Sequence, residues 1–449
     1  MRIVTVVLVV GIFASTLEFI QIWIPTTIFD WWDILWSWAG VLTAAGLFKI
    51  SLMLRKRLKR DKAAIKTIPG TLFIDQSGKL GGAELFLADI ALTLNQKCKV
   101  VLFEPGPFKE LLDKSGIPVS VLGEGVKMTK QSGMMGAIRA IPASVRILAA
   151  LVREAMHFDV LYANTAKAFV LGSLASVVSH KPLVYHLHDI ISASHFSRMN
   201  RWLLVFCANY FATKVIANSE ASKEAFILAG YRKSSVEVVY NGFDAHAFHV
   251  DQEAAAGVRR EYCVGEKPLC ILVGRITPWK GQHVFIEALS RNPDWHGLVV
   301  GDALFTDEDQ QYARELREKV RNSSLEDRIH FTGFQLDLRR FYSAADVVVH
   351  CSVAPEPFGR VIVESMLYGK PVIATSLGGV VEILKERVTG LLTLPNDANA
   401  LSDALRFCRS HPEEIQILAE RGKNYAKQNF SLSKITGQLQ KIIQEVFLK

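Results

Sequence analysis

Cysteine is scarce in this chain of 449 residues, and the six cysteines are scattered. None of them stands in a C-x-x-C pair, so the sequence indicates neither a structural zinc site nor a disulfide framework. No other reliable metal signature is present, and no metal is expected. Reduced, buried thiols in a cytoplasmic enzyme are the expectation for Cys98, Cys207, Cys263, Cys270, Cys351 and Cys408.

Positive and negative charges nearly balance outside one stretch of the chain. The formal net charge is +8, and residues 55–66 (RKRLKRDKAAIK) hold seven Lys or Arg against one Asp. A nucleic-acid binder would spread its basic side chains over a folded face, so this pattern argues against a nucleic-acid partner. A concentrated basic stretch directly after apolar segments indicates instead a juxtamembrane stretch at an anionic cytoplasmic leaflet.

The apolar segments are residues 3–24 and 34–54, and each approaches the roughly 20 residues that a helix needs to cross a bilayer. Five of the eight tryptophans lie in the first forty residues. We therefore expect residues 1–54 to anchor the chain as a membrane hairpin with both ends inside, which leaves the catalytic domains in the cytoplasm.

Two alternatives to this hairpin remain open. Glu18 and Lys49 lie within the apolar runs, where charge is costly, and a monotopic or re-entrant hairpin would accommodate them equally well. A signal peptide cleaved near Ala14 is the third interpretation, although the second apolar run would then remain.

Behind the basic stretch, short apolar strands alternate with helical patterns. Such alternation is typical of a mostly parallel sheet covered by helices. We expect two doubly wound, Rossmann-like domains, residues 67–250 and 251–430, that face each other across a cleft. Ligands of such sheets bind at the carboxyl ends of the strands. Residues 431–449 have a helical apolar pattern and could cross back to the first domain. The expected strands are residues 71–76, 99–103, 119–122, 160–163, 183–187, 214–217, 269–274, 297–300, 329–332, 347–350 and 372–374.

Residues 355–374 (PEPFGRVIVESMLYGKPVIA) combine a turn, a helix start and a buried strand with two carboxylates. The prolines hold Glu356 in an extended backbone, so the helix begins near Phe358 and Glu364 lies well inside it. Gly359 allows a close backbone approach. One carboxylate then lies at a helix N-terminus, which favours anions such as phosphates, and the other can accept hydrogen bonds from a diol. Two isolated glutamates would more often be a turn residue and half of a surface ion pair.

The stretch resembles the E-x7-E segment of the retaining glycosyltransferases of family 4. The resemblance includes Phe358, Gly359, Met366 and Gly369 in order, followed by a Pro-Val pair. It implies the GT-B architecture, a nucleotide-sugar as co-substrate, and no metal or other cofactor. In that family the first glutamate contacts the transferred sugar and the second the nucleotide ribose, and these would be Glu356 and Glu364. Phe358 and Gly359 would belong to the donor site.

A second motif places two cations on a strand-to-helix turn. Arg275 follows a strand, and Lys280 precedes a glycine and an amphipathic helix. A departing diphosphate needs fixed positive charge where its negative charge develops. Arg and Lys at a strand end are ordinarily solvated, but this segment resembles the G-R-x-x-x-x-K-G element of family 4. We therefore expect both side chains to bind the donor diphosphate.

Two further candidates lie in the first domain. Gly82, in the sequence GGAE at a helix N-terminus, suits backbone contact with a phosphate, although a plain tight turn is as compatible with the residues alone. His188 follows the strand LVYHL, and the His-Asp pair resembles the family motif whose histidine approaches the sugar. His186 alternates with His188 on one face, so one of the two could be a hydrogen-bonded core histidine.

Taken together, the sequence predicts a membrane-anchored glycosyltransferase. It would move a hexose-like unit to a lipid-linked or other glycan acceptor in cell-envelope polysaccharide biosynthesis. The resemblance implies retention at the anomeric carbon, with the departing diphosphate oxygen helping to deprotonate the acceptor. The alternatives are a nucleotide-sugar epimerase on the same fold and a non-catalytic membrane scaffold that binds nucleotide-sugars or partner proteins.

Overall fold

The computed structural model describes residues 68–449 apart from residues 95–96, 124–133, 194, 233–235 and 304–305. The chain divides into two compact units. The first unit runs to Ala217 and includes residues 223–239 and 436–449, and the second consists of residues 218–222 and 240–435. The membrane hairpin expected for residues 1–54 and the basic stretch 55–66 lie outside the described residues.

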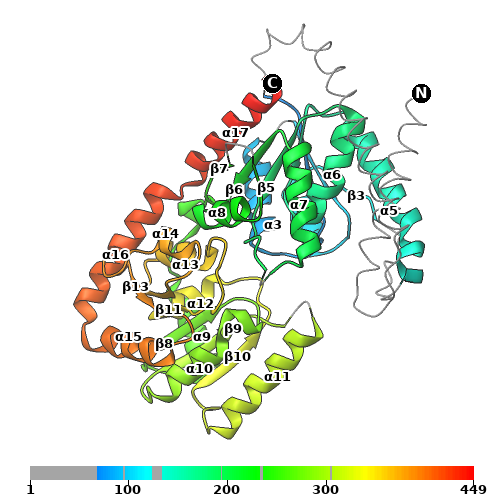
Figure 1. The fold of residues 1–449 in the computed structure, drawn as a ribbon. Coiled ribbons are helices and arrows are strands. Elements are labelled where there is room, and N and C mark those ends of the chain that lie inside the picture. The colour runs from blue at the N-terminus through cyan, green and yellow to red at the C-terminus, as the bar shows by residue number, and fades with distance from the viewer. Residues whose placement is uncertain (1–67, 95–96, 124–133, 194, 233–235, 304–305) are drawn as a thin grey trace. The chain divides into compact units, whose positions relative to one another are not determined.

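The first unit contains a parallel sheet of seven strands in the order β3-β2-β1-β4-β5-β6-β7 (Figure 1). The neighbours of β1 are β2 and β4, so the strand order reverses at β1. Ligands of doubly wound sheets bind at the carboxyl ends of the strands beside such a reversal. The strands are β1 (Thr71–Asp75), β2 (Cys98–Leu102), β3 (Val119–Val121), β4 (Val160–Ala163), β5 (Leu183–Leu187), β6 (Lys214–Ala217) and β7 (Val236–Val238).

The core of the first unit forms because the strands are apolar on both faces. Leu72 and Ile74 face a cluster that includes Leu148 and Leu151 of α5 and Phe169 of α6, all of them buried. The helices connecting these strands are α3 (Gly82–Leu94), α4 (Pro107–Lys114), α5 (Met134–Ala155), α6 (Ala166–Ser179), α7 (Arg198–Tyr210) and α8 (Glu220–Leu228).

The second unit contains a parallel sheet of six strands in the order β10-β9-β8-β11-β12-β13. Here β8 lies between β9 and β11, which repeats the reversal of the first sheet. The strands are β8 (Leu269–Val273), β9 (His296–Val300), β10 (Ile329–Gly333), β11 (Val347–His350), β12 (Val372–Thr375) and β13 (Leu391–Thr393).

Helices cover both faces of the second sheet. Cys270 and Leu272 face a cluster with α10, α11 and α15, and Leu269 and Ile271 face α9 and α12. The helices are α9 (Gln252–Glu261), α10 (Gln282–Ser290), α11 (Asp307–Asn322), α12 (Arg339–Ala344), α13 (Arg360–Leu367), α14 (Val380–Ile383), α15 (Ala398–Ser410) and α16 (Pro412–Asn429). The last helix of the chain is α17 (Leu432–Leu448).

The fold confirms the two Rossmann-like sheets and every strand expected from the sequence. Two edge strands of three residues, β7 and β13, were not expected. The domain boundaries and the cleft between the domains stay predictions.

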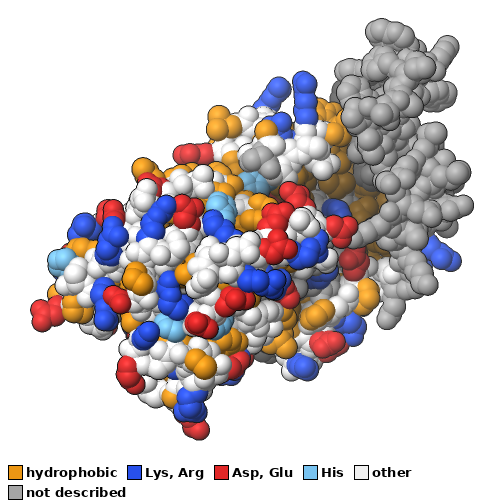
Figure 2. Space-filling model, turned by 90° about the horizontal axis from the view of Figure 1, so that it is seen from below, with side chains coloured by type: hydrophobic (Ala, Val, Ile, Leu, Met, Phe, Trp, Pro, Cys, Tyr) orange, Lys and Arg blue, Asp and Glu red, His pale blue; other side chains and the backbone are white. Residues whose placement is uncertain are grey.

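Within the described part of the chain, no helix combines the length and the apolar character needed to cross a membrane. Acidic and basic side chains are interspersed on the face shown in Figure 2, which fits the low net charge outside the basic stretch.

Candidate active site

The two glutamates of residues 355–374 lie on either side of a helix start. Helix α13 begins at Arg360, and Gly359 before it has a φ of 97°, a left-handed backbone that glycine adopts without strain. Glu356 lies in the preceding extended segment, where its carbonyl oxygen accepts a hydrogen bond from the Gly379 N–H at 2.8 Å. Glu364 lies inside the helix. The local structure therefore follows the arrangement that the proline spacing predicts.

The carboxylate of Glu356 is surrounded by donors. Lys280 Nζ lies 2.6 Å from Oε1 and 2.7 Å from Oε2. His350 Nε2 and Ser352 Oγ lie 2.6 Å and 2.9 Å from Oε2. Burial alone would raise the pKa of Glu356, but Lys280 and His350 outweigh burial and hold this pKa well below its usual range. Glu356 is therefore ionised at neutral pH and acts as a hydrogen-bond acceptor.

Lys280 reaches Glu356 from a turn 76 residues earlier in the chain. This turn is a short 3-10 helix, η3 (Pro278–Lys280), that leads into α10. Gly281 has a φ of 71°, and a Cβ at this position would lie 1.9 Å from the carbonyl oxygen of Cys351. Glycine therefore lets the turn pack directly against the chain after β11, and this contact brings Lys280 to Glu356.

Arg275 lies on the same turn, just after β8, with an exposed side chain. The Gln282 side chain donates to the Arg275 carbonyl oxygen at 2.7 Å, which fixes the backbone there. The Trp279 ring lies beside both cations, 5.9 Å from the Arg275 Cζ and 4.6 Å from the Lys280 Nζ. The turn thus holds two positive charges close together, as a diphosphate would require.

Glu364 has its own partners within the second unit. Tyr342 Oη donates to Oε2 at 2.8 Å, and Arg360 Nε lies 3.4 Å from Oε1. Burial, followed by the negative charge of Glu364, raises the pKa of Tyr342 well above its ordinary value, so this hydroxyl stays a donor. A carboxylate has about four lone-pair sites, which leaves Glu364 capacity to accept from a diol.

Phe358 lies in the core of the second unit with 2% of its surface exposed. Its ring stacks on Phe243 at a centroid distance of 6.5 Å and meets Phe430 edge-on at 5.7 Å. Its side chain therefore positions the turn, and any donor contact at Phe358 or Gly359 would come from the backbone.

In the first unit, His188 lies directly after β5. Its Nε2 lies 3.0 Å from Asn164 Oδ1. Asn164 Nδ2 donates to Asp75 Oδ2 at 2.7 Å and to the Ala83 carbonyl oxygen at 3.2 Å. A carbonyl oxygen can only accept, so the Asn164 amide is oriented, and the proton of the bond to His188 comes from Nε2. Asp75 and Asn164 thereby fix the tautomer of His188.

The sequence pattern indicated that one of His186 and His188 could be a core histidine. In the structure this residue is His186. It is fully buried, and its Nδ1 lies 2.6 Å from the hydroxyl oxygen of Tyr162. Burial, followed by the proximity of His188, lowers the pKa of His186 well below its ordinary value. His186 is therefore neutral and belongs to the packing of β5.

The predicted Gly82 is the first residue of α3. Two residues later, burial and the nearby charge of Asp75 raise the pKa of the Glu84 carboxyl to about 8. Burial also raises the pKa of Asp75 to about 6. The start of α3 therefore holds a buried carboxyl group that keeps its proton at neutral pH.

Sequence reasoning missed several residues that the structure places in these clusters. His350 is the last residue of β11, Ser352 comes shortly after this strand, and Asn164 follows β4. All three therefore lie at carboxyl ends of strands. That position was a usable signal, because ligand sites of parallel sheets gather at this edge. Glu84 was visible in the GGAE motif, but only its burial reveals its altered pKa.

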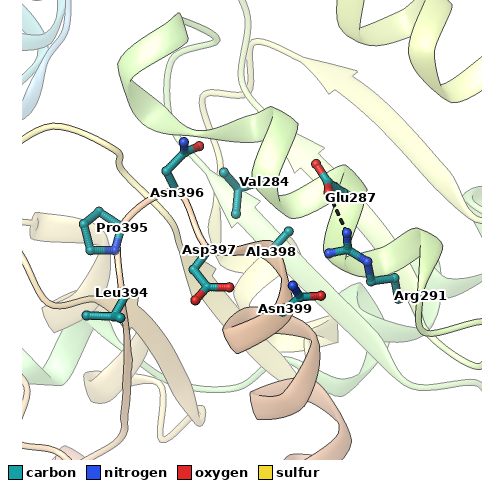
Figure 3. Close-up of a pocket in the computed structure, with 9 residues that line it drawn as sticks. All are labelled: Val284, Glu287, Arg291, Leu394, Pro395, Asn396, Asp397, Ala398 and Asn399. Atoms are coloured by element: carbon teal, nitrogen blue, oxygen red, sulfur yellow. Dashed lines mark hydrogen bonds and ion pairs between the residues drawn. The ribbon is translucent and has the colours of Figure 1, made fainter.

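A surface hollow of about 400 Å³ in the second unit involves none of these residues. Figure 3 shows that its wall comes from α10, the loop before α15 and the first turn of α15, with Glu287 paired to Arg291. The ion pair has a length of 2.7 Å. Among the residues that the structure describes, no group of three or more His, Cys, Asp or Glu side chains is arranged to hold a metal ion. Independence of a metal stays a prediction.

Comparison with known proteins identifies the class. Residues 80–247 match the model of Glycosyltransferase Family 4, and residues 259–428 match that of Glycosyl transferases group 1. The crystal structure of HepE from Anabaena in complex with UDP and glucose is 40% identical with a TM-score of 0.77. That match covers 84% of this chain and 99% of the other. The chain therefore belongs to the glycosyltransferases with GT-B architecture that carry family 4 and group 1 domains.

More distant matches include one further glycosyltransferase and one protein for which the likeness is in the fold alone. An uncharacterized glycosyltransferase of Methanocaldococcus jannaschii is 29% identical over 268 residues, which are 55% of this chain and 64% of that protein. Sucrose-phosphate synthase from Thermosynechococcus elongatus shares the fold, with 21% identity, a TM-score of 0.71, and 84% of this chain and 98% of that chain covered. The chain spans between 54% and 64% of the length of the first curated relatives that it matches.

Proposed function

We propose that this chain transfers a hexose from a UDP-sugar to a glycan acceptor with retention at the anomeric carbon. The observation that carries the proposal is the buried contact between Lys280 and Glu356. It joins a cationic strand-to-helix turn, suited to a diphosphate, to an ionised carboxylate, suited to a sugar hydroxyl. The diphosphate and the sugar are the two parts of a nucleotide-sugar that the scissile bond joins.

The nucleotide is inferred from the 40% identical HepE, whose structures include complexes with UDP and with UDP-glucose. In the proposed complex Arg275 and Lys280 bind the diphosphate, and Glu364 accepts hydrogen bonds from the ribose hydroxyls. Lys280 has three N–H donors. Even with one bond to each oxygen of Glu356, one donor is left for a phosphate oxygen.

Glu356 and His188 are proposed to bind the transferred sugar, and the backbone at Gly82 to contact the donor phosphates. Each charge-assisted hydrogen bond of this kind contributes about 1.5–3 kcal/mol. Charge fixed beside the departing diphosphate stabilises the transition state more than water does, because the protein groups need no reorientation during the reaction.

Retention would follow from a same-face reaction. The bond between the anomeric carbon and the diphosphate oxygen breaks, and the acceptor oxygen forms its bond on the same face. The acceptor proton passes to the departing phosphate oxygen. The low pKa of Glu356 supports this route, because a carboxylate held by several hydrogen bonds is a poor nucleophile and a poor general base near neutral pH.

The acceptor is proposed to be lipid-linked, with the enzyme held at the cytoplasmic face of a membrane in the assembly of an envelope polysaccharide. The apolar runs and the basic stretch in residues 1–66 support this part of the proposal. A relative in Mycobacterium tuberculosis, 29% identical over 195 residues that are 42% of this chain and 50% of that protein, is a GDP-mannose-dependent phosphatidylinositol monomannoside mannosyltransferase. We propose that no metal is required.

The test is hydrolysis of UDP-glucose by the full-length protein in detergent, with and without EDTA, and NMR of the released sugar. Initial release of α-glucose from the α-linked donor, unaffected by EDTA and lost in Arg275→Ala, supports the proposal. Initial release of β-glucose would exclude retention. Conversion of the intact donor to another UDP-hexose would indicate an epimerase, and absence of both UDP binding and turnover would overturn the assignment of the donor.

A further inference from the structure

The starting observation is the position of His350 beside Glu356. His350 is the last residue of β11 and is 5% exposed. Its Nε2 lies 2.6 Å from Glu356 Oε2, and its backbone carbonyl accepts from Thr375 Oγ1 at 3.2 Å. Since β11 lies between β8 and β12, the imidazole is held on a central strand of the second sheet. Such a support holds a side chain more rigidly than a loop does.

The direction of the hydrogen bond follows from the chemistry of the partner. Glu356 is ionised, so both of its oxygens can only accept, and the proton must lie on His350 Nε2. Ser352 Oγ lies 2.9 Å from the same Oε2 and donates to it as well. His350 Nδ1 is buried and has no hydrogen-bond partner among the residues that the structure describes.

The two oxygens of Glu356 are consequently in different situations. Oε2 faces three donors, Lys280 at 2.7 Å, His350 at 2.6 Å and Ser352 at 2.9 Å. In the described part of the chain, the hydrogen-bond donor of Oε1 is Lys280 at 2.6 Å. A carboxylate oxygen has about two lone-pair sites, so Oε2 is saturated while Oε1 retains capacity.

We propose that His350 is a positioning residue that, with Ser352, occupies Oε2 and leaves Oε1 as the single oxygen that receives a hydroxyl of the donor sugar. This inference rests on the proposed role of Glu356 as a sugar ligand. The arrangement selects a sugar that offers a hydroxyl at one position and disfavours a sugar that lacks this hydroxyl or carries a carboxylate there. His350 thereby sets donor specificity without touching the sugar.

The test compares three forms of the full-length protein, wild type, His350→Gln and His350→Phe. The glutamine variant keeps an N–H donor within reach of Oε2, whereas the phenylalanine variant keeps bulk without a donor. The probes are UDP, UDP-glucose and a set of UDP-glucose analogues that each lack one sugar hydroxyl. Dissociation constants are measured by calorimetry, and the unfolding temperature of each variant is recorded.

In the wild type, one analogue should bind about 10- to 100-fold more weakly than UDP-glucose, which is the effect of one charge-assisted hydrogen bond. In His350→Phe this discrimination should shrink to about threefold or less, because the Glu356 carboxylate loses the donor on β11 that fixes its orientation, while the affinity for UDP stays unchanged. His350→Gln should restore most of it. A purely structural role would instead weaken UDP and all analogues together.

Two results would overturn the inference, and the second of them would also remove Glu356 as the proposed ligand of the sugar. The first is His350→Phe with wild-type discrimination and intact UDP binding, and the second is a wild type that binds UDP but treats every analogue alike. A wild type that binds neither UDP nor UDP-glucose would overturn the proposed donor as well. If His350→Phe does not fold, Ser352→Ala in the His350→Gln background provides the same comparison, because it also removes a donor from Oε2.

Discussion

At the scale of single residues, the contact between Lys280 and Glu356 pairs two opposite charges at a largely buried position, where either charge alone would be unfavourable. Their side chains are 12% and 13% exposed. Removing one member of a buried ion pair leaves the other charge without a partner, and such a change costs about 3–5 kcal/mol. The pair therefore serves the stability of the second unit as well as the proposed chemistry.

The first prediction follows from this double role. Lys280→Met should destabilise the second unit by about 3 kcal/mol and should abolish hydrolysis of UDP-glucose. Denaturant unfolding and a donor hydrolysis assay measure the two effects. The double variant Lys280→Met with Glu356→Gln is the matched control, since it removes both charges. It should recover most of the lost stability and none of the activity. Equal stabilities of the single and double variants would contradict the buried pair.

The second prediction concerns Glu84, whose pKa of about 8 in the folded protein lies above its ordinary value of 4.5. Between these values the folded chain binds a proton that the unfolded chain has released. The free energy of unfolding should therefore fall as pH rises through this window, by at most about 1.4 kcal/mol per pH unit.

Glu84→Gln should flatten this part of the pH profile, because glutamine does not titrate. Unfolding temperatures of the full-length protein between pH 5 and pH 8.5 would measure the difference between variant and wild type. A variant profile parallel to that of the wild type would show that Glu84 ionises normally. Asp75, whose pKa burial raises from 3.8 to about 6, should lower the free energy of unfolding over a narrower window, as pH rises between these two values, in both proteins.

At the scale of elements, the turn between β8 and α10 depends on one glycine. Gly281 has a positive φ and no room for a Cβ beside the Cys351 carbonyl oxygen. Gly281→Ala, the third prediction, should lower the stability of the second unit by about 2 kcal/mol or more through strain. It should also reduce kcat for hydrolysis, because Lys280 precedes the displaced residue.

The matched control is Gly257→Ala in helix α9. A Cβ at Gly257 meets no atom within 4 Å, and the backbone there is helical. Alanine should stabilise this helix by about 0.5–1 kcal/mol without changing activity. Chemical denaturation compares the two variants, and a stabilising Gly281→Ala would show that the turn does not need its glycine.

The elements also show how far sequence reasoning can go. Strands such as β8 are continuous hydrophobic runs, so they could be predicted together with the parallel sheets that they imply. The meeting of Lys280 with Glu356 spans 76 residues, and that of Asn164 with Asp75 spans 89. The lysine and the glutamate were expected at one site from the family resemblance, but their direct contact, like that of Asn164 with Asp75, depends on tertiary packing.

His350 illustrates the same limit. As a single histidine at the end of a strand it resembles the many histidines that serve only in packing, such as His186. Only the distance of 2.6 Å to Glu356 distinguishes it. The role of a histidine near the end of a strand can therefore be argued only from a structure.

At the scale of the whole molecule, ligand binding and folding are linked. A nucleotide that binds only the folded protein stabilises it by RT ln(1 + [L]/Kd), which is about 2.7 kcal/mol at a concentration of 100 Kd. The fourth prediction is that UDP raises the unfolding temperature of the full-length protein in this way. Glu364→Gln should lose most of the shift, since the proposed ribose contact weakens. An undiminished shift in this variant would place the ribose elsewhere.

The strands at the edges of the two sheets have a consequence for handling the protein. β3, β7 and β13 are edge strands of three residues each, and β10, the fourth edge strand, has five. A short edge presents few unpaired N–H and C=O groups, so it is a poor template for the addition of a strand from another chain. The edges of the first sheet should accordingly resist fibril seeding at high concentration, whereas addition of a strand from another chain should be sought at β10 and in the apolar N-terminal runs.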